Sequence, residues 1–357
     1  MRHASSLFLP LFVLLAGCSS SGGGSGGTTD FRCPDDVAPA ENSAFCEAVA
    51  TDPSCDIVTA GQRHQVCGVP LTKPLSELER SANVKKYAGS GPPDLGCYAP
   101  AGYPAAPGTP SMVTMTGVAE IFSHGCASTN LTIEVWTVKR TGGADDGDLG
   151  TLIGSPVTTP ADCMAESLAT EEDDCGTRYE CNYTYPGVPT ETELVIRTDG
   201  DVWAPLYEYN IFIRNEAAPG GTWTHNVRAL AQDDYGVISQ VALGAPITVG
   251  HGAIAGEVHD CGDVRLVNAV VDVNVDKAVT TYFTNDEEHP LPELQARGTS
   301  TLGLFSSMDI KAGPVSVGAV GLVDGTVTTV GYFQARVFED AVTSVTFRGL
   351  PPFLIQK

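Results

Sequence analysis

The sequence predicts an all-β protein built mainly from two β-sandwiches in tandem. The chain has 39 glycines and 24 prolines among 357 residues and few long apolar segments, a composition that favours strands and turns over helices. Short runs of alternating apolar and polar residues recur, with the period of two of a half-buried strand. Hydrophobic residues make up 42% of the chain, enough for real cores. We place the sandwiches at 111–250 and 251–357.

The N-terminus has the pattern of a bacterial lipoprotein signal. A basic start is followed by an apolar run at 7–15, which is too short to span a bilayer as a helix of about 20 residues. The tetrapeptide LAGC, ending at Cys18, resembles the lipobox of bacterial lipoproteins. The resemblance implies that 1–17 is a signal peptide and that Cys18 becomes the acylated first residue. Several acyl chains together would anchor the protein stably.

This signal predicts an extracytoplasmic protein, lipid-anchored in the cell envelope and most consistent with the outer membrane. Residues 18–30 form a Gly/Ser-rich linker with the composition of a flexible coil. The formal net charge of −23 gives no basic footprint for nucleic acid. The expected partners are therefore the membrane, through the lipid anchor, and a protein or glycan ligand.

Cysteine usage agrees with an oxidising compartment. Of the 11 cysteines, Cys18 is assigned to the lipid, which leaves an even number for disulfides. The candidates are Cys33, Cys46, Cys55, Cys67, Cys97, Cys126, Cys163, Cys175, Cys181 and Cys261. The four between 126 and 181 are expected to pair among themselves. A cross-link between Cys97 and Cys261 would pair the lone C-terminal cysteine with the cysteine-rich N-terminal segment.

That segment, 31–110, is predicted to be a small disulfide-rich region of loops and short helices. One helix is expected at 41–50. Another is expected at 76–87, where Pro74, Ser76 and Glu79 resemble helix-start residues.

The first sandwich is predicted to carry a long acidic insertion at 139–182. Its strands are expected at 113–122, 131–135, 183–185, 193–197, 206–214 and 223–230, with a short helix at 234–243 that ends at Gly244. Tyr207, Tyr209, Ile211 and Ile213 alternate with other residues, so they are expected to share one face.

The second sandwich has a denser strand pattern. Strands are expected at 271–275, 279–283, 302–305, 315–322, 332–338 and 342–347. Asp324-Gly325 lies between two of these runs and is typical of a tight hairpin turn.

The second sandwich also resembles a known family. The stretches GAIAGEV at 252–258 and LVNAVVDV at 266–273, with Thr299 and the GLF at 303–305, are similar to carboxypeptidase regulatory-like domains. The resemblance implies a small transthyretin-like, Ig-like sandwich without catalytic residues. The family's usual aspartate after that threonine and its tyrosine after the turn glycine Gly313 are absent. A weaker echo of the pattern within 117–196 suggests a degenerate internal repeat.

The acidic insertion contains the candidate binding residues. Asp145, Asp146 and Asp148 are candidate Ca²⁺ ligands, although they lack EF-hand spacing, and a solvated acidic loop is the alternative. The acidic run 171–174 allows the same two interpretations, or a carboxylate pair for acid–base chemistry. We expect no other cofactor and no firm metal site. One hypothesis places partner recognition on loops 142–150 and 164–180, since long ordered loops are usually functional. The alternative is an inert surface insertion.

Two further patterns each allow two interpretations. His259-Asp260-Cys261 contains the residue types of a nucleophilic site, but Cys261 is better explained as half of a disulfide. Trp136, Trp203 and Trp223 suit either a sugar-stacking platform or packing in a core.

The sequence therefore predicts a non-catalytic envelope lipoprotein whose sandwiches bind a protein or glycan or act as spacers. The alternatives are a carbohydrate-binding accessory protein and a secreted hydrolase using clustered carboxylates.

Overall fold

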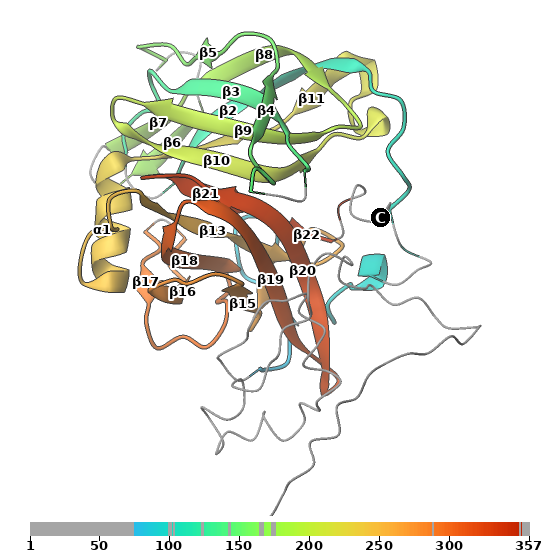
Figure 1. The fold of residues 1–357 in the computed structure, drawn as a ribbon, viewed down its shortest axis with the longest axis vertical. Helices are drawn as coiled ribbons and strands as arrows, with labels where there is room; N and C mark the ends of the chain where they lie inside the picture. Colours follow the sequence, from blue (N-terminus) through green and yellow to red (C-terminus); the bar gives the residue numbers. More distant parts are fainter. Residues whose placement is uncertain are drawn as a thin grey trace, which may run out of the picture.

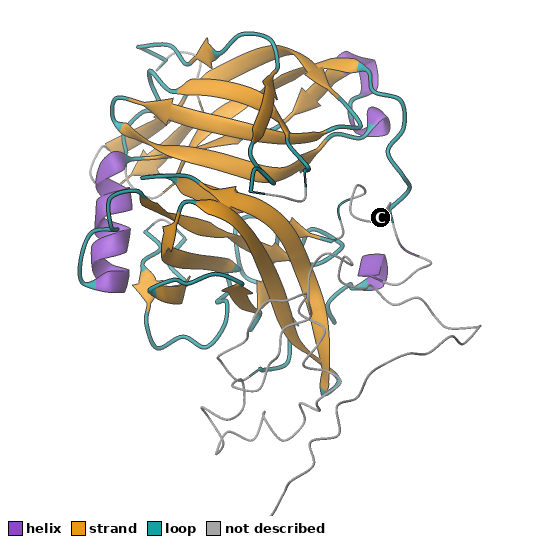
Figure 2. Ribbon diagram, viewed as in Figure 1, coloured by secondary structure: helices purple, strands orange, loops and turns teal. Residues whose placement is uncertain are grey.

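The computed structural model describes residues 75–98, 102, 104–122, 125–141, 144–163, 168–172, 176–287, 289–349 and 351. These residues form a nearly all-β structure with one α-helix, α1 (Gln232–Leu243), and short 3-10 helices at Gly96–Tyr98, Asn215–Ala217 and Pro219–Gly221 (Figure 2). The first twelve strands are β1 (Glu79–Arg80), β2 (Met112–Phe122), β3 (Thr132–Val138), β4 (Leu149–Leu152), β5 (Val157–Thr158), β6 (Leu168–Glu172), β7 (Gly176–Glu180), β8 (Asn182–Pro189), β9 (Glu193–Gly200), β10 (Trp203–Phe212), β11 (Thr222–Thr224) and β12 (Val227–Leu230). The later strands are β13 (His251–His259), β14 (Leu266–Val267), β15 (Val270–Val273), β16 (Val279–Phe283), β17 (Pro292–Glu293), β18 (Leu304–Lys311), β19 (Gly313–Val323), β20 (Thr326–Val337), β21 (Val342–Val345) and β22 (Phe347–Arg348).

A single mixed sheet runs through both predicted sandwiches (Figure 1). Its order is β17-β16-β18-β13-β21-β10-β9-β3-β4, with β22 beside β13 and β5 beside β3. β21, from the C-terminal end of the chain, lies between β10 and β13 and is parallel to both. Val342 is the register partner of Leu206 on one side and of Ala253 on the other. β21 therefore joins the two halves.

The first core lies between this sheet and a smaller one. β2, β8, β11 and β12 form a four-stranded sheet that packs on one face of β3, β9 and β10. Met115 from β2, Ile133 from β3 and Tyr185 from β8 are fully buried there. This half is the β-sandwich predicted for the region.

The second core is shared between the halves. The three-stranded sheet β15-β19-β20 packs on the large sheet, and its core includes Val195 from β9 and Tyr209 from β10. Along β9, Leu194 and Ile196 enter the first core, whereas Val195 enters the second. The middle of the large sheet is thus buried on both faces.

Two local predictions are confirmed. Asp324 and Gly325 adopt φ values of 50° and 74° and turn β19 into β20, as expected for a tight hairpin. Helix α1 ends at Gly244, whose φ is 71° and whose N–H donates to the carbonyl of Gln240 at 2.9 Å.

The helix predicted at 76–87 is wrong. Residues 77–80 form bridge and strand instead: β1 pairs with β14, and the N–H of Leu78 donates to the carbonyl of Leu322 at 2.8 Å. Bends follow at 83 and 85–87. A Cβ on Gly321 would lie 2.3 Å from the side chain of Leu78, so the glycine makes room for this buried leucine. Pairing and burial against the second half outweigh the local helix-start pattern. The helix predicted at 41–50 lies outside the described residues.

The single face predicted for the β10 residues is also wrong. Tyr207 and Tyr209 pack against the second core, whereas Ile211 and Ile213 lie in the first. The register against β9 shifts between Glu208 and Ile211, and the intervening Asn210 has a φ of 61°. This β-bulge inserts one residue and reverses the faces beyond it.

The insertion at 139–182 contains strands rather than loops alone. β4 and β5 pair with β3 at the edge of the large sheet, and β6 pairs with β7 as a separate hairpin. Residues 149–150 and most of 168–180 are therefore strand where recognition loops were predicted.

Two disulfides cross-link parts of the described chain. Cys163 bonds to Cys181 (S–S 1.95 Å), within the group expected to pair together, and Cys126 is also disulfide-bonded. Cys97 bonds to Cys261 (S–S 1.99 Å), the cross-link that the cysteine distribution suggested. Cys33, Cys46, Cys55, Cys67 and Cys175 lie outside the described residues, as does Cys18.

Within the described part of the chain, no helix has the length and apolar character required to cross a membrane.

Candidate functional site

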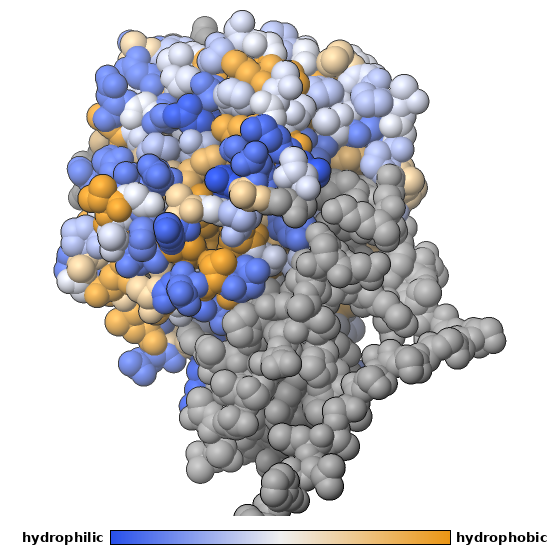
Figure 3. All heavy atoms as spheres, in the orientation of Figure 1, coloured by the Kyte–Doolittle hydropathy of each residue, from blue (hydrophilic) through white to orange (hydrophobic). Residues whose placement is uncertain are grey.

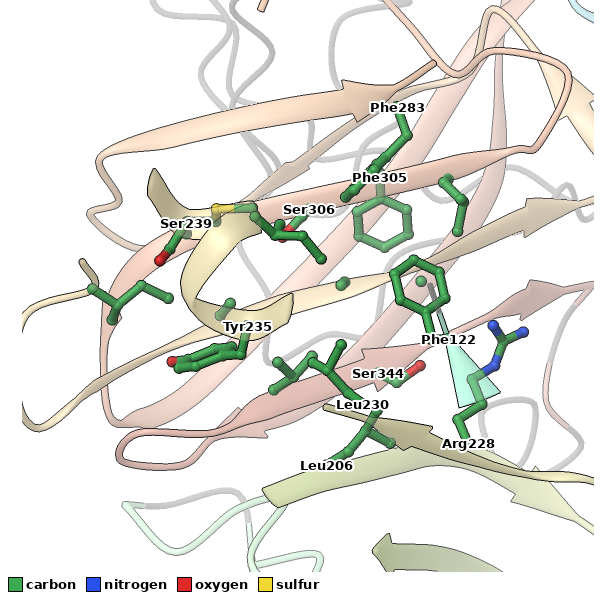
Figure 4. A pocket seen from close by; sticks show the side chains of 18 residues that line it. Phe122, Leu206, Arg228, Leu230, Tyr235, Ser239, Phe283, Phe305, Ser306 and Ser344 are labelled. Carbon is green, nitrogen blue, oxygen red and sulfur yellow. The ribbon is translucent and has the colours of Figure 1, made fainter. Parts of the chain in front are cut away.

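A pocket lies beneath helix α1, on the face of the large sheet that points away from the second core. Along β13, Ala253 and Ala255 point to this side, while Ile254 points into the second core. Helix α1, which connects β12 to β13, crosses this face and covers only part of it. Space remains between the helix and the strands (Figure 4).

The pocket wall is mainly apolar and comes from both halves of the molecule. The pocket is open to solvent, and the space between its walls, including the mouth, is about 660 Å³. Six of the lining residues are Phe122, Leu230, Ile238, Phe283, Leu304 and Met308. On the outer side of α1, Val237 and Val241 are exposed, and apolar side chains reach the surface where the helix lies at the left of Figure 3.

Few polar atoms reach the pocket, and most of them are satisfied by the protein. Ser239 Oγ donates to the carbonyl of Gly236 at 2.9 Å, and Ser306 Oγ donates to that of Ile254 at 3.3 Å. Tyr235 differs, because its Oη is buried without a hydrogen-bond partner among the described residues. Burial raises the pKa of Tyr235 to about 12, and the nearby Asp340 and Asp309 act in the same direction.

A buried network of ion pairs adjoins the pocket at Arg228. The Arg228 guanidinium donates to Glu257, which also lies 2.7 Å from His259 Nε2 and accepts from Arg265 Nε at 3.0 Å. Burial by itself would raise the pKa of Glu257, but Arg228, His259 and Arg265 together hold it well below its usual range. Glu257 is therefore a compensated buried anion.

His259 links this network to the surface. Its Nδ1 lies 2.7 Å from Asp263, and the ring of Tyr87 packs against it with centroids 4.8 Å apart. Arg348 Nε also contacts Asp263, at 3.0 Å. Cys261, two residues along, is bonded to Cys97, so the sequence His259-Asp260-Cys261 does not supply a free thiol. The geometry suits structural charge pairing between strands.

Two of the three candidate Ca²⁺ ligands, Asp146 and Asp148, contact basic residues, and the backbone carbonyl of Asp145 accepts the N–H of Asp148 at 3.1 Å. Asp146 lies 3.6 Å from Arg140 and accepts the N–H of Thr141 at 2.9 Å, and Asp148 lies 3.3 Å from Lys139. Across the residues that the structure describes, no group of three or more His, Cys, Asp or Glu side chains is placed to hold a metal ion.

The tip of the same loop packs on β20 of the second half. The Tyr209 hydroxyl donates to the carbonyl of Gly147, and Arg336 Nη1 donates to that of Ala144 at 2.8 Å. Residues 144–147 thus connect the two halves, a role that the acidic composition of the loop did not indicate. The side chains of the run 171–174 lie outside the described residues. The structure therefore gives no arrangement of carboxylates that supports the hydrolase alternative.

The three tryptophans do not form a common platform. Trp203 is buried, and its Nε1 donates to the carbonyl of Thr129 at 2.9 Å, while Trp136 packs against the second core. Trp223 stacks on His225 beside the first core. Core packing, the second of the two interpretations, accounts for them.

No protein-family model matches the chain, and no curated protein matches it either. Among solved structures, the chain is similar to a streptococcal ancillary pilin, with 12% identity and a TM-score of 0.18, over 67% of this chain and 63% of the pilin. It is also similar to a mutant shaft pilin, SpaA, from Lactobacillus rhamnosus GG, with 9% identity and a TM-score of 0.19, over 67% of this chain and 100% of that one. The chain thus spans less than two thirds of the streptococcal pilin. Likeness at this level assigns neither a family nor a function.

Proposed function

We propose that the protein is a non-catalytic, lipid-anchored component of the bacterial cell envelope. Its two sandwiches act as one rigid body that spaces or presents a binding surface. The sheet shared by the two halves is the observation that carries this proposal. A spacer or presenting module must hold its parts in fixed positions, and a continuous hydrogen-bonded sheet does so.

Three further contacts support rigidity. The carbonyl of Ala144, in the loop after β3, accepts from Arg336 of β20. Arg228 of β12 pairs with Glu257 of β13, which joins the halves on the opposite face of the sheet. The bond between Cys97 and Cys261 fixes residues before the first sandwich to the second.

The compartment is supported by the disulfides, because such bonds persist in oxidising environments. The anchor rests on the sequence pattern at Cys18, and the Gly/Ser linker that follows would give the rigid body reach from the membrane.

Replacing the lipidated residue tests the anchor. The variant Cys18→Ala should move from the membrane fraction to the soluble fraction, because it lacks the thiol that would carry the lipid. Ser19→Ala is the matched control and should remain with membranes. Retention of Cys18→Ala on membranes washed with high salt would show a different attachment and would contradict the proposal.

A further inference from the structure

We infer that His259 is a pH-sensitive latch for the loop 81–89. Its ring holds the loop on the second half while both ring nitrogens carry a proton, and loss of one of these protons loosens the loop. The inference goes beyond the proposed function and does not depend on the lipid anchor.

The contacts on both sides of the ring fix the protonation of His259. The side chain is fully buried, and its Nε2 and Nδ1 each lie 2.7 Å from a carboxylate, that of Glu257 and that of Asp263. Burial by itself would raise the pKa of Glu257, but Arg228 and its other cationic partners hold it well below its usual range, and Asp263 contacts Arg348 Nε at 3.0 Å. Both carboxylates are therefore ionised. An ionised carboxylate only accepts hydrogen bonds, so each ring nitrogen carries a proton.

The loop 81–89 is held through Tyr87. The carbonyl of Tyr87 accepts the N–H of Arg265 at 3.0 Å. Its ring packs on the His259 ring with centroids 4.8 Å apart, and the guanidinium carbons of Arg265 and Arg348 lie 5.5 and 5.1 Å from its centre. An aromatic face attracts cations, so a doubly protonated His259 holds Tyr87 more strongly than a neutral ring would.

The flanks of the loop are fixed independently of His259. Before the loop, Arg80 Nε donates to Asp260 at 2.6 Å. After the loop, the N–H of Asp94 donates to the same carboxylate at 2.8 Å, and Cys97 bonds to Cys261. Loss of the ring proton should therefore loosen a local loop and leave the segment on either side in place.

The other charged groups around the ring do not change charge near neutral pH. They are Glu208 on β10 with its partner His225, Arg228 on β12, Glu257 on β13, Asp260, Asp263 and Arg265 after β13, Arg348 on β22, and Arg80 and Asp94 on either side of the loop. Carboxylates and guanidinium groups titrate far from pH 7, and the second histidine of this set contacts Glu208 and not the loop. The ring of His259 is thus the group that can respond.

Proton loss should act on the side of Asp263. A neutral ring has one bare nitrogen, whose lone pair would face a carboxylate. Glu257 is 1% exposed and cannot regain water, whereas the side chain of Asp263 is 45% exposed and can turn to solvent. Asp263 lies two residues before Arg265, so its departure loosens the backbone that holds Tyr87. Because the folded contacts require the second proton, the loop is held at low pH and loosens as the pH rises.

NMR spectroscopy of the full-length Cys18→Ala protein tests the inference. The ¹⁵N shifts of the His259 ring report its protonation from about pH 6 to about pH 9, and hydrogen exchange of the Arg265 amide reports the hold on Tyr87. The protection factor of this amide should fall at least about tenfold as the ring loses a proton, the value of a hydrogen bond to a charged group. The two midpoints should coincide. The Cys261 amide, which donates to Asp94, is the internal control and should keep its protection.

Two variants separate the latch from other effects of pH. His259→Gln should abolish the pH dependence, because glutamine stays neutral throughout the range. His251→Gln is the matched control and should retain it, since His251 also lies 3.1 Å from an aspartate, Asp309, but does not contact the loop. Should His259→Gln fail to fold, the coincidence of the two midpoints in the protein with His259 intact still decides the question.

Three results would overturn the inference. The first is a His259 ring with a single proton at about pH 6. The second is protection of the Arg265 amide that stays constant while the ring titrates. The third is the same loss of protection in His259→Gln.

Discussion

Glu257 is the residue on which the buried charges converge. It is 1% exposed and contacts Arg228, His259 and Arg265. A buried carboxylate is tolerated when cations and hydrogen bonds replace its hydration, and removal of one member leaves the others uncompensated. The network therefore depends on this single anion.

We expect Glu257→Gln to lower the free energy of unfolding by about 3–5 kcal/mol, because two guanidinium groups would lose their buried counter-charge. Urea denaturation at pH 7 measures the loss. Glu293→Gln, at an exposed position on β17, is the control and should change stability little. Equal losses of stability from the two substitutions would show that the buried network contributes no more than an exposed carboxylate.

The same carboxylate predicts a pH dependence. Because the pKa of Glu257 is lowered in the folded state, the unfolded chain binds more protons in acid. The contribution of Glu257 to the free energy of unfolding is complete above its pKa in the unfolded chain, about 4.3. This contribution is lost as the pH falls toward the lower pKa that Glu257 has in the folded protein. Wild-type stability should therefore decline below about pH 4, and Glu257→Gln should show a shallower decline over that range.

At the scale of elements, the loop 139–148 joins the halves through a glycine. Gly147 has a φ of +77°, and a Cβ there would lie 2.9 Å from the carbonyl carbon and oxygen of Ala335. Gly187 has a similar φ of +74° but has nothing within 4 Å of its Cβ position. Alanine at Gly187 would cause backbone strain alone, whereas alanine at Gly147 would cause the same strain and a steric clash. Comparing the two substitutions distinguishes these effects.

Gly187→Ala should cost about 1–2 kcal/mol from the left-handed conformation alone. Gly147→Ala should lower the free energy of unfolding by about 1–3 kcal/mol more, because the loop must also move away from β20. Chemical denaturation of the two variants side by side makes the comparison. Similar losses would mean that the contact between the loop and β20 is readily displaced.

The strands were largely predictable, whereas their partners were not. A period of two identifies a strand such as 193–197 locally, but it does not show which sheet the strand joins. The consecutive apolar residues at 194–196 are typical of a strand buried on both faces, and this was the available signal for the shared sheet. The strand at 79–80 depends on pairing with residues 266–267, far away in sequence, and no local pattern marked the bulge at Asn210.

The candidate site was less predictable than the fold. The helix at 234–243 was expected, but the pocket exists only because α1 crosses strands that come together in the folded chain. Tyr235 carried no motif that marked it. His259 was noticed as part of a nucleophile pattern, while its actual partners, Glu257 and Asp263, were not.

For the whole molecule, the disulfide between Cys97 and Cys261 should contribute more to the free energy of unfolding than the one between Cys163 and Cys181. Cys97 and Cys261 are 164 residues apart, whereas Cys163 and Cys181 are 18 apart. Loop-closure entropy predicts that removing the first bond by a double serine substitution costs roughly 4–5 kcal/mol, against about 3 kcal/mol for the second. Urea denaturation of both double variants measures this, and a larger loss from the shorter loop would contradict the entropic account.

The shared sheet also predicts how the molecule unfolds. Because Val195 and Tyr209 belong to the second core while their strands complete the first, the halves should melt together. Calorimetry should show one transition whose calorimetric and van't Hoff enthalpies agree. Two separated transitions would show that the halves are energetically independent.

The position of β21 has a consequence for biosynthesis. A chain leaves the ribosome N-terminus first, so residues 342–345 emerge after both strands on which they pair. Until they arrive, the strand edges of β10 and β13 on which β21 pairs have no partner between them. Open edges of this kind pair readily with other chains, and parallel contacts between distant segments form slowly. A nascent or truncated chain that ends before residue 342 would therefore carry two exposed strand edges at its centre and would be prone to aggregate before export is complete.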